Sequence, residues 1–325
     1  MLYLRSRYCA YAAAKGEIMI LSVCPNPSID CTVEVEQLNV GRMNRIDNKI
    51  ITYSGKALNA AIGVARLGED SFATGFMYTA NGSLFTETLD NEGVKNSFVW
   101  NKGSVRVNYK IVDNKSMLTE INDRGEEVGA DKQNELITLV KTLAENSSVV
   151  IMSGSLPKGV GDDFYARIIR ALPKNVVTIV DSEGDKLINA VNEGVYMVKP
   201  NLSELEGVIK RELKTKKDYV DGCKFLIDKG AKYVLLSLGR AGAVLCNDKA
   251  AYFCKSAAVA VNSTVGAGDS MVAAAAVMIE KNMPDDVILR SAVAAGTASI
   301  TTPGTNLFYR DKYEEIYDKI FVEKI

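Results

Sequence analysis

Short, almost entirely apolar runs alternate along the chain with longer segments of helical character. The apolar runs are 149–152, 176–180, 195–198 and 233–237, and helical segments include 131–145, 162–172 and 217–229. Strands that are apolar on both sides are typical of a parallel sheet covered by helices. The alternation therefore predicts an α/β fold with a doubly wound, mainly parallel sheet and helices on both faces.

Two regions depart from this pattern. Residues 31–53 and about 97–123 alternate polar and apolar positions without helical periodicity, and 122–125 (Asn-Asp-Arg-Gly) supplies a turn. Such alternation predicts antiparallel strands with one buried face. They are either an ordinary edge of the main sheet or a small separate sheet. Because they flank a glycine-containing segment at 54–57, we favour a small β lid over a site.

The chain is expected to form one domain over residues 19–325. Met19 stands directly before the first strand-like run, 20–23, and the preceding residues 1–18 are expected to be a disordered extension. No apolar run approaches the ~20 residues that a membrane helix needs. Six cysteines without a C-x-x-C pair indicate reduced, mostly buried thiols. These features predict a cytoplasmic protein.

Composition excludes several function classes. With 47% hydrophobic and 24% charged residues, the chain resembles an ordinary soluble enzyme, and its formal net charge of -1 gives no basic field for nucleic acid or a membrane. The chain contains no histidine. This excludes Ser-His-Asp and Cys-His catalysis, HExxH metalloproteases and histidine-ligated zinc. Acid–base chemistry must then fall to Asp, Glu, Lys, Tyr or Cys.

The segment 261–270 (VNSTVGAGDS) is the leading candidate for the chemistry. It precedes an alanine-rich helical stretch, 271–280. Gly266 and Gly268 allow a tight turn whose N–H groups converge at a helix N-terminus and bind an anion. Asp269 lies where its carboxylate can take a proton from an attacking hydroxyl. The alternative is that Asp269 only caps the helix.

Two common nucleotide motifs are missing. Gly55 and Lys56 are followed by Ala57, so the P-loop pattern G-x-x-x-x-G-K-[ST] does not occur, and no strand-linked G-x-G-x-x-G supports a dinucleotide cofactor. The sequence therefore supports neither a P-loop nor a dinucleotide-binding motif.

A set of short motifs occurs in a fixed order between Met19 and Thr305. They are 26–30 (NPSID), 55–59 (GKALN), 106–110 (RVNYK), 119–122 (TEIN), 153–157 (SGSLP), 199–204 (KPNLSE), 237–242 (SLGRAG) and 266–269 (GAGD). Each is weak alone, but the ordered set is specific. In it the chain resembles the PfkB (ribokinase-like) carbohydrate kinases, in particular the branch of 1-phosphofructokinases and tagatose-6-phosphate kinases.

The resemblance implies a doubly wound sheet with a small β lid and an ATP-dependent carbohydrate kinase that uses Mg²⁺. The implied reaction moves the γ-phosphoryl group of ATP onto a phosphosugar of the fructose 1-phosphate or tagatose 6-phosphate type, giving a sugar bisphosphate. Asp269 would be the general base, and the amides of Gly266, Ala267 and Gly268 would bind the transferred group.

The resemblance also assigns the remaining site residues. The implied substrate-binding residues are Asp30, Gly55, Lys56, Asn59, Arg106, Asn108, Lys110, Glu120 and Ser153. The implied ATP-binding residues are Lys199, Asn201, Ser237, Gly239, Gly242 and Thr264. Asn201 and Glu204 would organise Mg²⁺, directly or through water.

Physical arguments support a substrate-binding role for Lys56, Arg106 and Lys110 to different degrees. Lys56 at a helix start opposes the macrodipole unless an anion is near. Arg106 and Lys110 fall on one face of a strand, and the planar fork of Arg106 suits a phosphate group. For Lys110, a solvated lid face is the alternative.

The chain departs from the resembling branch in one segment, and two rival functions remain. The resembling branch usually has glycine where this chain has Ser54 and Ala57, so the local backbone is expected to differ in a way that affects which sugar is accepted. The rivals are a kinase for an unphosphorylated sugar or nucleoside, and a catalytically idle regulator that binds nucleotide or sugar. We expect small-molecule substrates, no nucleic-acid or membrane partner, and a homodimer formed through the lid.

Overall fold

The computed structural model describes residues 19–115, 117–302 and 307–325, and the expected extension 1–18 lies outside these residues. Strands of the large sheet are β1 (Met19–Cys24), β4 (Ser71–Tyr78), β5 (Lys95–Asn96), β6 (Val99–Asn101), β9 (Ser147–Ser153), β10 (Val177–Asp181), β11 (Met197–Val198), β12 (Tyr233–Ser237), β13 (Ala243–Cys246), β14 (Ala251–Cys254) and β15 (Val322–Lys324). Their order is β15-β14-β13-β12-β11-β10-β9-β1-β4-β5, with β6 paired to β4. Pairing is parallel up to β12 and antiparallel from β12 to β15. The predicted doubly wound, mainly parallel sheet is confirmed.

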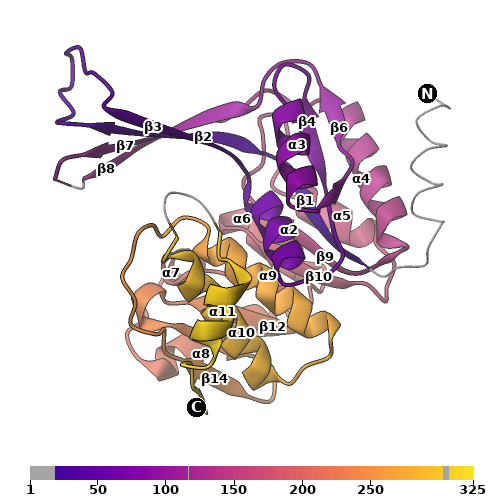
Figure 1. The fold of residues 1–325 in the computed structure, drawn as a ribbon. Helices are drawn as coiled ribbons and strands as arrows, with labels where there is room; N and C mark the ends of the chain where they lie inside the picture. The colour runs from indigo at the N-terminus through magenta and orange to yellow at the C-terminus, as the bar shows by residue number, and fades with distance from the viewer. Residues whose placement is uncertain (1–18, 116, 303–306) are drawn as a thin grey trace.

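Helices cover both faces of this sheet (Figure 1). One layer contains α2 (Lys56–Arg66), α3 (Ser83–Asn91), α9 (Ala267–Glu280), α10 (Asp285–Ser299) and α11 (Arg310–Tyr317); the other contains α4 (Ala130–Ala144), α5 (Phe164–Ala171), α6 (Gly184–Asn192), α7 (Leu202–Ile209) and α8 (Lys216–Asp228). Within β9, Val149 and Ile151 pack under α9, whereas Val150 and Met152 pack under the opposite layer. Strands buried on both faces explain the continuous apolar runs in the sequence.

A second, smaller sheet projects from the body (Figure 1). It consists of β2 (Ser28–Val35), β3 (Asn48–Ser54), β7 (Arg106–Asp113) and β8 (Leu118–Asn122), in the order β3-β2-β7-β8. The outer pairings are antiparallel, but β2 and β7 are parallel. Both strands leave the body in the same direction because the chain returns through α2, β4 and α3 between them. Residues of β6, within the region assigned to the lid from sequence, pair with β4 instead.

The two faces of this lid differ in chemistry. Residue alternation and register place Asp30, Asn108 and Lys110 on one face. Tyr109 and Ile121 lie opposite each other on the other face and are 45% and 57% exposed. The lid therefore has one polar face and one apolar, solvent-exposed face.

The polar groups of the large sheet gather at the carboxyl ends of its parallel strands. Ser153 ends β9, Asp181 ends β10 and Lys199 follows β11. This edge is where open α/β sheets bind their ligands. Among the helices that the structure describes, none has the length and apolar character to cross a membrane.

The contact between β1 and β4 requires a glycine, which gives a direct test of the core. Gly75 has φ +149°, and an added Cβ would lie 1.8 Å from the Cys24 carbonyl oxygen. Gly75→Ala is expected to lower the free energy of unfolding by about 3 kcal/mol or more, because the strands must separate. Gly207→Ala is the matched control, since nothing lies within 4 Å of its Cβ position on α7 and helical alanine is favoured by ~1 kcal/mol. Urea unfolding of both variants measures the difference, and equal stabilities would contradict the close approach.

Candidate active site

The N-terminus of α9 forms the centre of the site. Gly266 caps the helix with φ +81°, and an added Cβ would lie 2.8 Å from the Leu307 side chain. A side chain at this position would therefore be both strained and crowded. The helix then begins at Ala267, so the amides of its first turn have no intrahelical acceptor. This geometry provides an anion site next to Asp269.

Asp269 lies in the first turn of α9 and is buried. Its Oδ2 accepts a 2.7 Å hydrogen bond from Nδ2 of Asn59, on α2. Burial raises the pKa of Asp269 to about 6, although the nearby charge of Lys56 opposes this rise. The carboxylate is thus ionised at neutral pH and is a stronger base than an exposed aspartate.

A second buried carboxylate, Asp181, lies beside it and binds two lysines. Its Oδ1 is 3.3 Å from Nζ of Lys199 and 3.9 Å from Nζ of Lys56, and its Oδ2 accepts a hydrogen bond from Ser153. Burial opposes ionisation of Asp181, but the two ammonium groups hold its pKa below the usual range. The charge of Asp181 in turn raises the pKa of Lys56. Asp181 and Lys56 are therefore both charged at neutral pH.

Lys199 lies directly behind the glycine-containing turn. A Cβ added to Gly268 would lie 3.2 Å from the Lys199 ammonium nitrogen. The ammonium group, which is almost fully buried, therefore adds positive charge beneath the amides of α9. Glycine at position 268 allows this close approach.

Asp30 forms a second polar cluster on the lid. Its Oδ1 accepts hydrogen bonds from the Ser28 hydroxyl (3.0 Å) and from Nδ2 of Asn108 (3.1 Å), and its Oδ2 accepts from the Lys110 ammonium (3.0 Å). The Asp30, Asn108 and Lys110 side chains are buried. Lys110 is thus paired with a carboxylate and does not lie on a solvated lid face.

Arg106 crosslinks the base of the lid. Its guanidinium donates to the carbonyl oxygens of Asn26, Pro27 and Asp123, and to Oδ1 of Asn108. These bonds join the start of β7 to the segment between β1 and β2 and to the loop after β8. Burial lowers the pKa of Arg106 from its usual value. The Arg106 guanidinium therefore donates four hydrogen bonds to acceptors within the protein.

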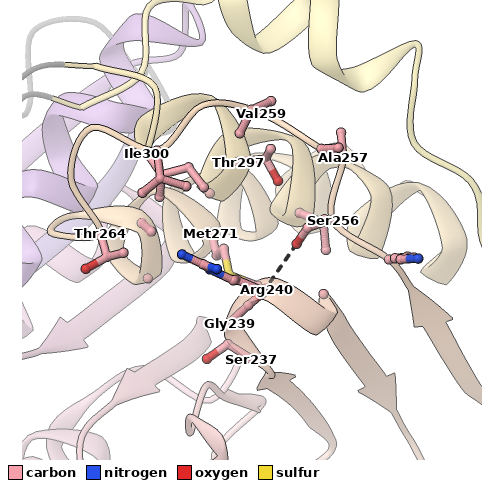
Figure 2. A pocket seen from close by; sticks show the side chains of 18 residues that line it. Ser237, Gly239, Arg240, Ser256, Ala257, Val259, Thr264, Met271, Thr297 and Ile300 are labelled. Carbon is pink, nitrogen blue, oxygen red and sulfur yellow. Dashed lines mark hydrogen bonds between the residues drawn. The ribbon is translucent and has the colours of Figure 1, made fainter.

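A cavity of about 740 Å³ opens beside the start of α9 (Figure 2). Figure 2 shows Met271 of α9 and Thr297 of α10 on one wall and Ala257 and Val259 on the segment opposite. Its lining includes four residues that the resemblance assigns to ATP, namely Ser237, Gly239, Gly242 and Thr264. The cavity reaches Gly268, so it meets the anion site at the N-terminus of α9.

Two of the glycines that line this cavity, Gly239 and Gly242, differ in what surrounds them. Gly239 begins a short 3₁₀ turn, Gly239–Ala241, and nothing lies within 4 Å of its Cβ position. At Gly242 an added Cβ would lie 1.9 Å from the Cys254 carbonyl oxygen. Glycine at 242 is therefore required by the neighbouring strand β14, independently of any ligand.

Asn201 and Glu204 form a capping box at the start of α7. Oδ1 of Asn201 accepts from the Glu204 amide and from the Ser203 hydroxyl, while Oε2 of Glu204 accepts from the Asn201 amide. These bonds leave Oε1 of Glu204 as the carboxylate oxygen outside the box. Among the described residues, no group of three or more Asp, Glu, Cys or His side chains is arranged to hold a metal ion.

In the structure most sequence-predicted residues fall into four groups: around Asp269 and Asp181, around Asp30 on the lid, along the cavity, and in the capping box of α7. Glu120 lies opposite Lys110 in the pairing of β7 and β8 but is exposed. Gly55 packs against Cys24, whose sulfur would lie 2.7 Å from an added Cβ. The sequence reasoning missed Asp181, whose only signal is an acidic residue at the end of an apolar strand.

Comparison with known proteins agrees with this geometry. The model of the family described as "pfkB family carbohydrate kinase" matches residues 22–312. The tagatose-6-phosphate kinase of Staphylococcus epidermidis is 30% identical over 94% of this chain and 100% of its own length, and the 1-phosphofructokinase of Borreliella burgdorferi is 30% identical over 86% and 91%.

A solved structure of phosphofructokinase-2 from Escherichia coli, 29% identical, matches with a TM-score of 0.86 over 93% of this chain and 99% of that chain. Another structure of that protein is its tetrameric inhibited form. Family model and relatives each span most of the chain, and the resemblance found from the ordered motifs is confirmed. The protein belongs to the pfkB family of carbohydrate kinases.

Proposed function

We propose that this kinase transfers the γ-phosphoryl group of ATP to a hydroxyl of a phosphosugar of the fructose 1-phosphate or tagatose 6-phosphate type, giving a sugar bisphosphate. One observation carries the proposal. A buried carboxylate with a pKa of about 6, Asp269, lies in the first turn of a helix whose N-terminus faces an anion site. The relatives named for these two substrates support the choice of acceptor.

In this mechanism Asp269 takes the proton of the acceptor hydroxyl as its oxygen attacks the γ-phosphorus, and ADP leaves. The amides of Gly266, Ala267 and Gly268 bind the transferred group at the positive end of α9. Lys199 beneath the turn and Lys56 beside it add positive charge where the phosphoryl oxygens gain negative charge. The protein's contribution is positioning and electrostatics.

The proposed nucleotide site is the cavity between α10 and residues 255–261. Its apolar walls suit a base, and its end at Gly268 places the phosphates over α9. Bound Mg²⁺ would neutralise the charge of the ATP phosphates. The residues present fit that ion, because Mg²⁺ keeps several waters and needs only one or two protein oxygens. Oε1 of Glu204 would hold it through water, beside Asn201.

On the acceptor side, Asp30 and Lys110 are proposed to bind sugar hydroxyls. Oδ2 of Asp30 accepts one bond in the structure, so it has room for a hydroxyl donor, and Lys110 has donors to spare. The acceptor's phosphate is assigned to Arg106, through the part of its fork not bound to carbonyls, together with Lys56, whose side chain is 47% exposed.

A second acceptor class is supported by the same contacts. Arg106 donates to four protein acceptors, and Lys110 is paired with Asp30. Lid cations that are already bonded to protein favour a neutral acceptor, either an unphosphorylated sugar or a nucleoside. A coupled assay of ADP release over a panel of sugars, nucleosides and phosphosugars separates the two classes.

We further infer that residues 19–325 act as one cytoplasmic kinase domain. Cys24, Cys31, Cys223, Cys246 and Cys254 are free and buried in the described part of the chain. Unpaired thiols fit a reducing compartment. A second copy of the chain is the proposed partner, bound through the apolar lid face that exposes Ile51, Tyr109 and Ile121.

Asp269→Asn is expected to lower kcat by about 10²–10⁴-fold while ATP binding is retained, since the change removes only the base. The parent's kcat should fall as the pH drops through about 6, where Asp269 protonates. Steady-state kinetics and ATP titration measure both. A variant with near-native kcat would exclude Asp269 as the base.

The same variant makes a stability prediction. The pKa of Asp269 is higher in the folded state than in the unfolded state, so its charged form destabilises the fold. The destabilisation is complete above about pH 6 and absent below about pH 4. Asp269→Asn should thus raise the free energy of unfolding at pH 7.5 by about 1–3 kcal/mol, an advantage that shrinks between pH 6 and 4. Urea unfolding across this range checks the sign.

Arg106→Ala is expected to raise KM for a phosphorylated acceptor by about 10- to 150-fold, corresponding to a charge-assisted hydrogen bond of roughly 1.5–3 kcal/mol. The KM for ATP should change little. Arg106→Lys should restore only part of the lost affinity for the phosphorylated acceptor, because lysine lacks the planar fork of arginine. If the KM values for all accepted phosphosugars stay at the parent value, Arg106 serves only to crosslink the lid, and the neutral acceptor is favoured.

Tyr109→Lys combined with Ile121→Lys should convert the proposed dimer to monomers, because the charges fall on the apolar lid face. Ile50→Lys is the control, since Ile50 is also exposed but lies on the opposite face of the lid. Analytical ultracentrifugation at micromolar concentration measures the mass. A parent chain that is monomeric, or a dimer that survives the double substitution, would contradict the lid interface.

A further inference from the structure

Asn59 and Asp269 meet where two helices begin. Asn59 is in the first turn of α2, Asp269 is in the first turn of α9, and both are buried. One turn further along each helix, Gly63 faces Ala273, and a Cβ added to Gly63 would lie 2.7 Å from the Ala273 Cβ. This close packing fixes how far apart the two helix starts lie, and thereby fixes the distance from Asn59 to the base.

The orientation of the Asn59 amide follows from its neighbours. An ionised carboxylate can only accept hydrogen bonds, so the atom 2.7 Å from Oδ2 of Asp269 must be the amide nitrogen. The same nitrogen lies 3.3 Å from the hydroxyl oxygen of Ser54, which is also buried. Both amide N–H groups are therefore directed at protein atoms, and only Oδ1 remains for a sugar hydroxyl.

Ser54 stands at a position where the resembling branch usually has glycine, which has no hydroxyl. Ser54 is the last residue of β3, and its hydroxyl oxygen also lies 3.5 Å from Oδ1 of Asn59. The serine thus supplies the second partner of the amide and restricts its rotation. Without it, a buried N–H of Asn59 would lose that partner.

From these contacts we infer that Asn59, held by Ser54, is a positioning residue that fixes the carboxylate of Asp269, with Oδ2 bound and Oδ1 presented to the acceptor hydroxyl. The inference rests on the proposed role of Asp269 as base. It differs from the role that the resemblance assigns to Asn59, which is direct binding of the sugar. A donor to the carboxylate also favours its charged form, which agrees with the direction in which Asn59 moves the pKa of Asp269.

The decisive variant is Asn59→Asp, which keeps the size of the side chain and replaces the donor with an acceptor. Two carboxylates in contact share a proton, so the acidic limb of the kcat–pH profile should move to higher pH by one unit or more, and kcat near pH 7 should fall at least tenfold. The KM of the acceptor should stay within about threefold. If Asn59 instead binds the sugar directly, the KM of the acceptor rises well beyond threefold, and that result would overturn the inference.

A readout independent of activity accompanies the kinetics. The ¹³C carboxyl resonance of Asp269, assigned by its loss in Asp269→Asn, is titrated in the parent and in Asn59→Asp without substrate. An upward shift of its midpoint is expected, and an unchanged midpoint would contradict the contact. If the parent phosphorylates nothing in the acceptor panel but the midpoint still moves, the proposed function fails and the contact stands.

Two further variants complete the design. Ser54→Ala keeps the bond from Asn59 to Asp269 but removes the second partner, so we expect a two- to tenfold fall in kcat and a smaller shift of the limb in the same direction. It tests the inference if Asn59→Asp does not fold, and unchanged kcat and limb would then overturn it. Asn134→Asp, an exposed position on α4, is the matched control and should match the parent.

Discussion

The pairing of Asp181 with Lys199 is the interaction on which the rest of the site depends. Both side chains are almost fully buried at the edge of the large sheet, and a buried ammonium without a partner would be strongly destabilising. Asp181 therefore has to be present for Lys199 to lie beneath the first turn of α9. Lys199 in turn crowds position 268, because an added Cβ there would lie 3.2 Å from its ammonium nitrogen. A charge pair, a glycine and a helix start are thus tied to one another by packing.

This arrangement explains how a basic carboxylate and an anion site can coexist within one helix turn. Burial makes Asp269 reluctant to ionise, and the neighbouring Asp181 adds to that effect, while Lys56 opposes it. The balance leaves a carboxylate that is charged near neutral pH but still accepts a proton readily. The same lysines that keep Asp269 ionised lie where negative phosphoryl oxygens are proposed to bind, so one set of charges serves both purposes.

The sequence predicted features that depend on local pattern and missed those that depend on distant pairing. Apolar runs gave the sheet, and the glycines before Asp269 gave the helix start. Asp181 escaped because one acidic residue at a strand end looks the same whether its neighbours are lysines or water. Likewise, alternation marked β2 and β7 as lid strands, but their parallel pairing depends on the chain path between them. The carbonyl partners of Arg106 come from two segments far apart in the chain, 26–27 and 123, and leave no trace in the sequence.

The alternation that builds the lid also couples its two faces. Tyr109 stands between Asn108 and Lys110 on β7, so the residue exposed on the apolar face is one peptide unit from the two residues that bind Asp30. A one-residue slip of β7 would turn all three side chains to the wrong face. Any partner that buries Tyr109 therefore also fixes the register that holds the Asp30 cluster, and the proposed subunit contact would help to order the proposed acceptor site.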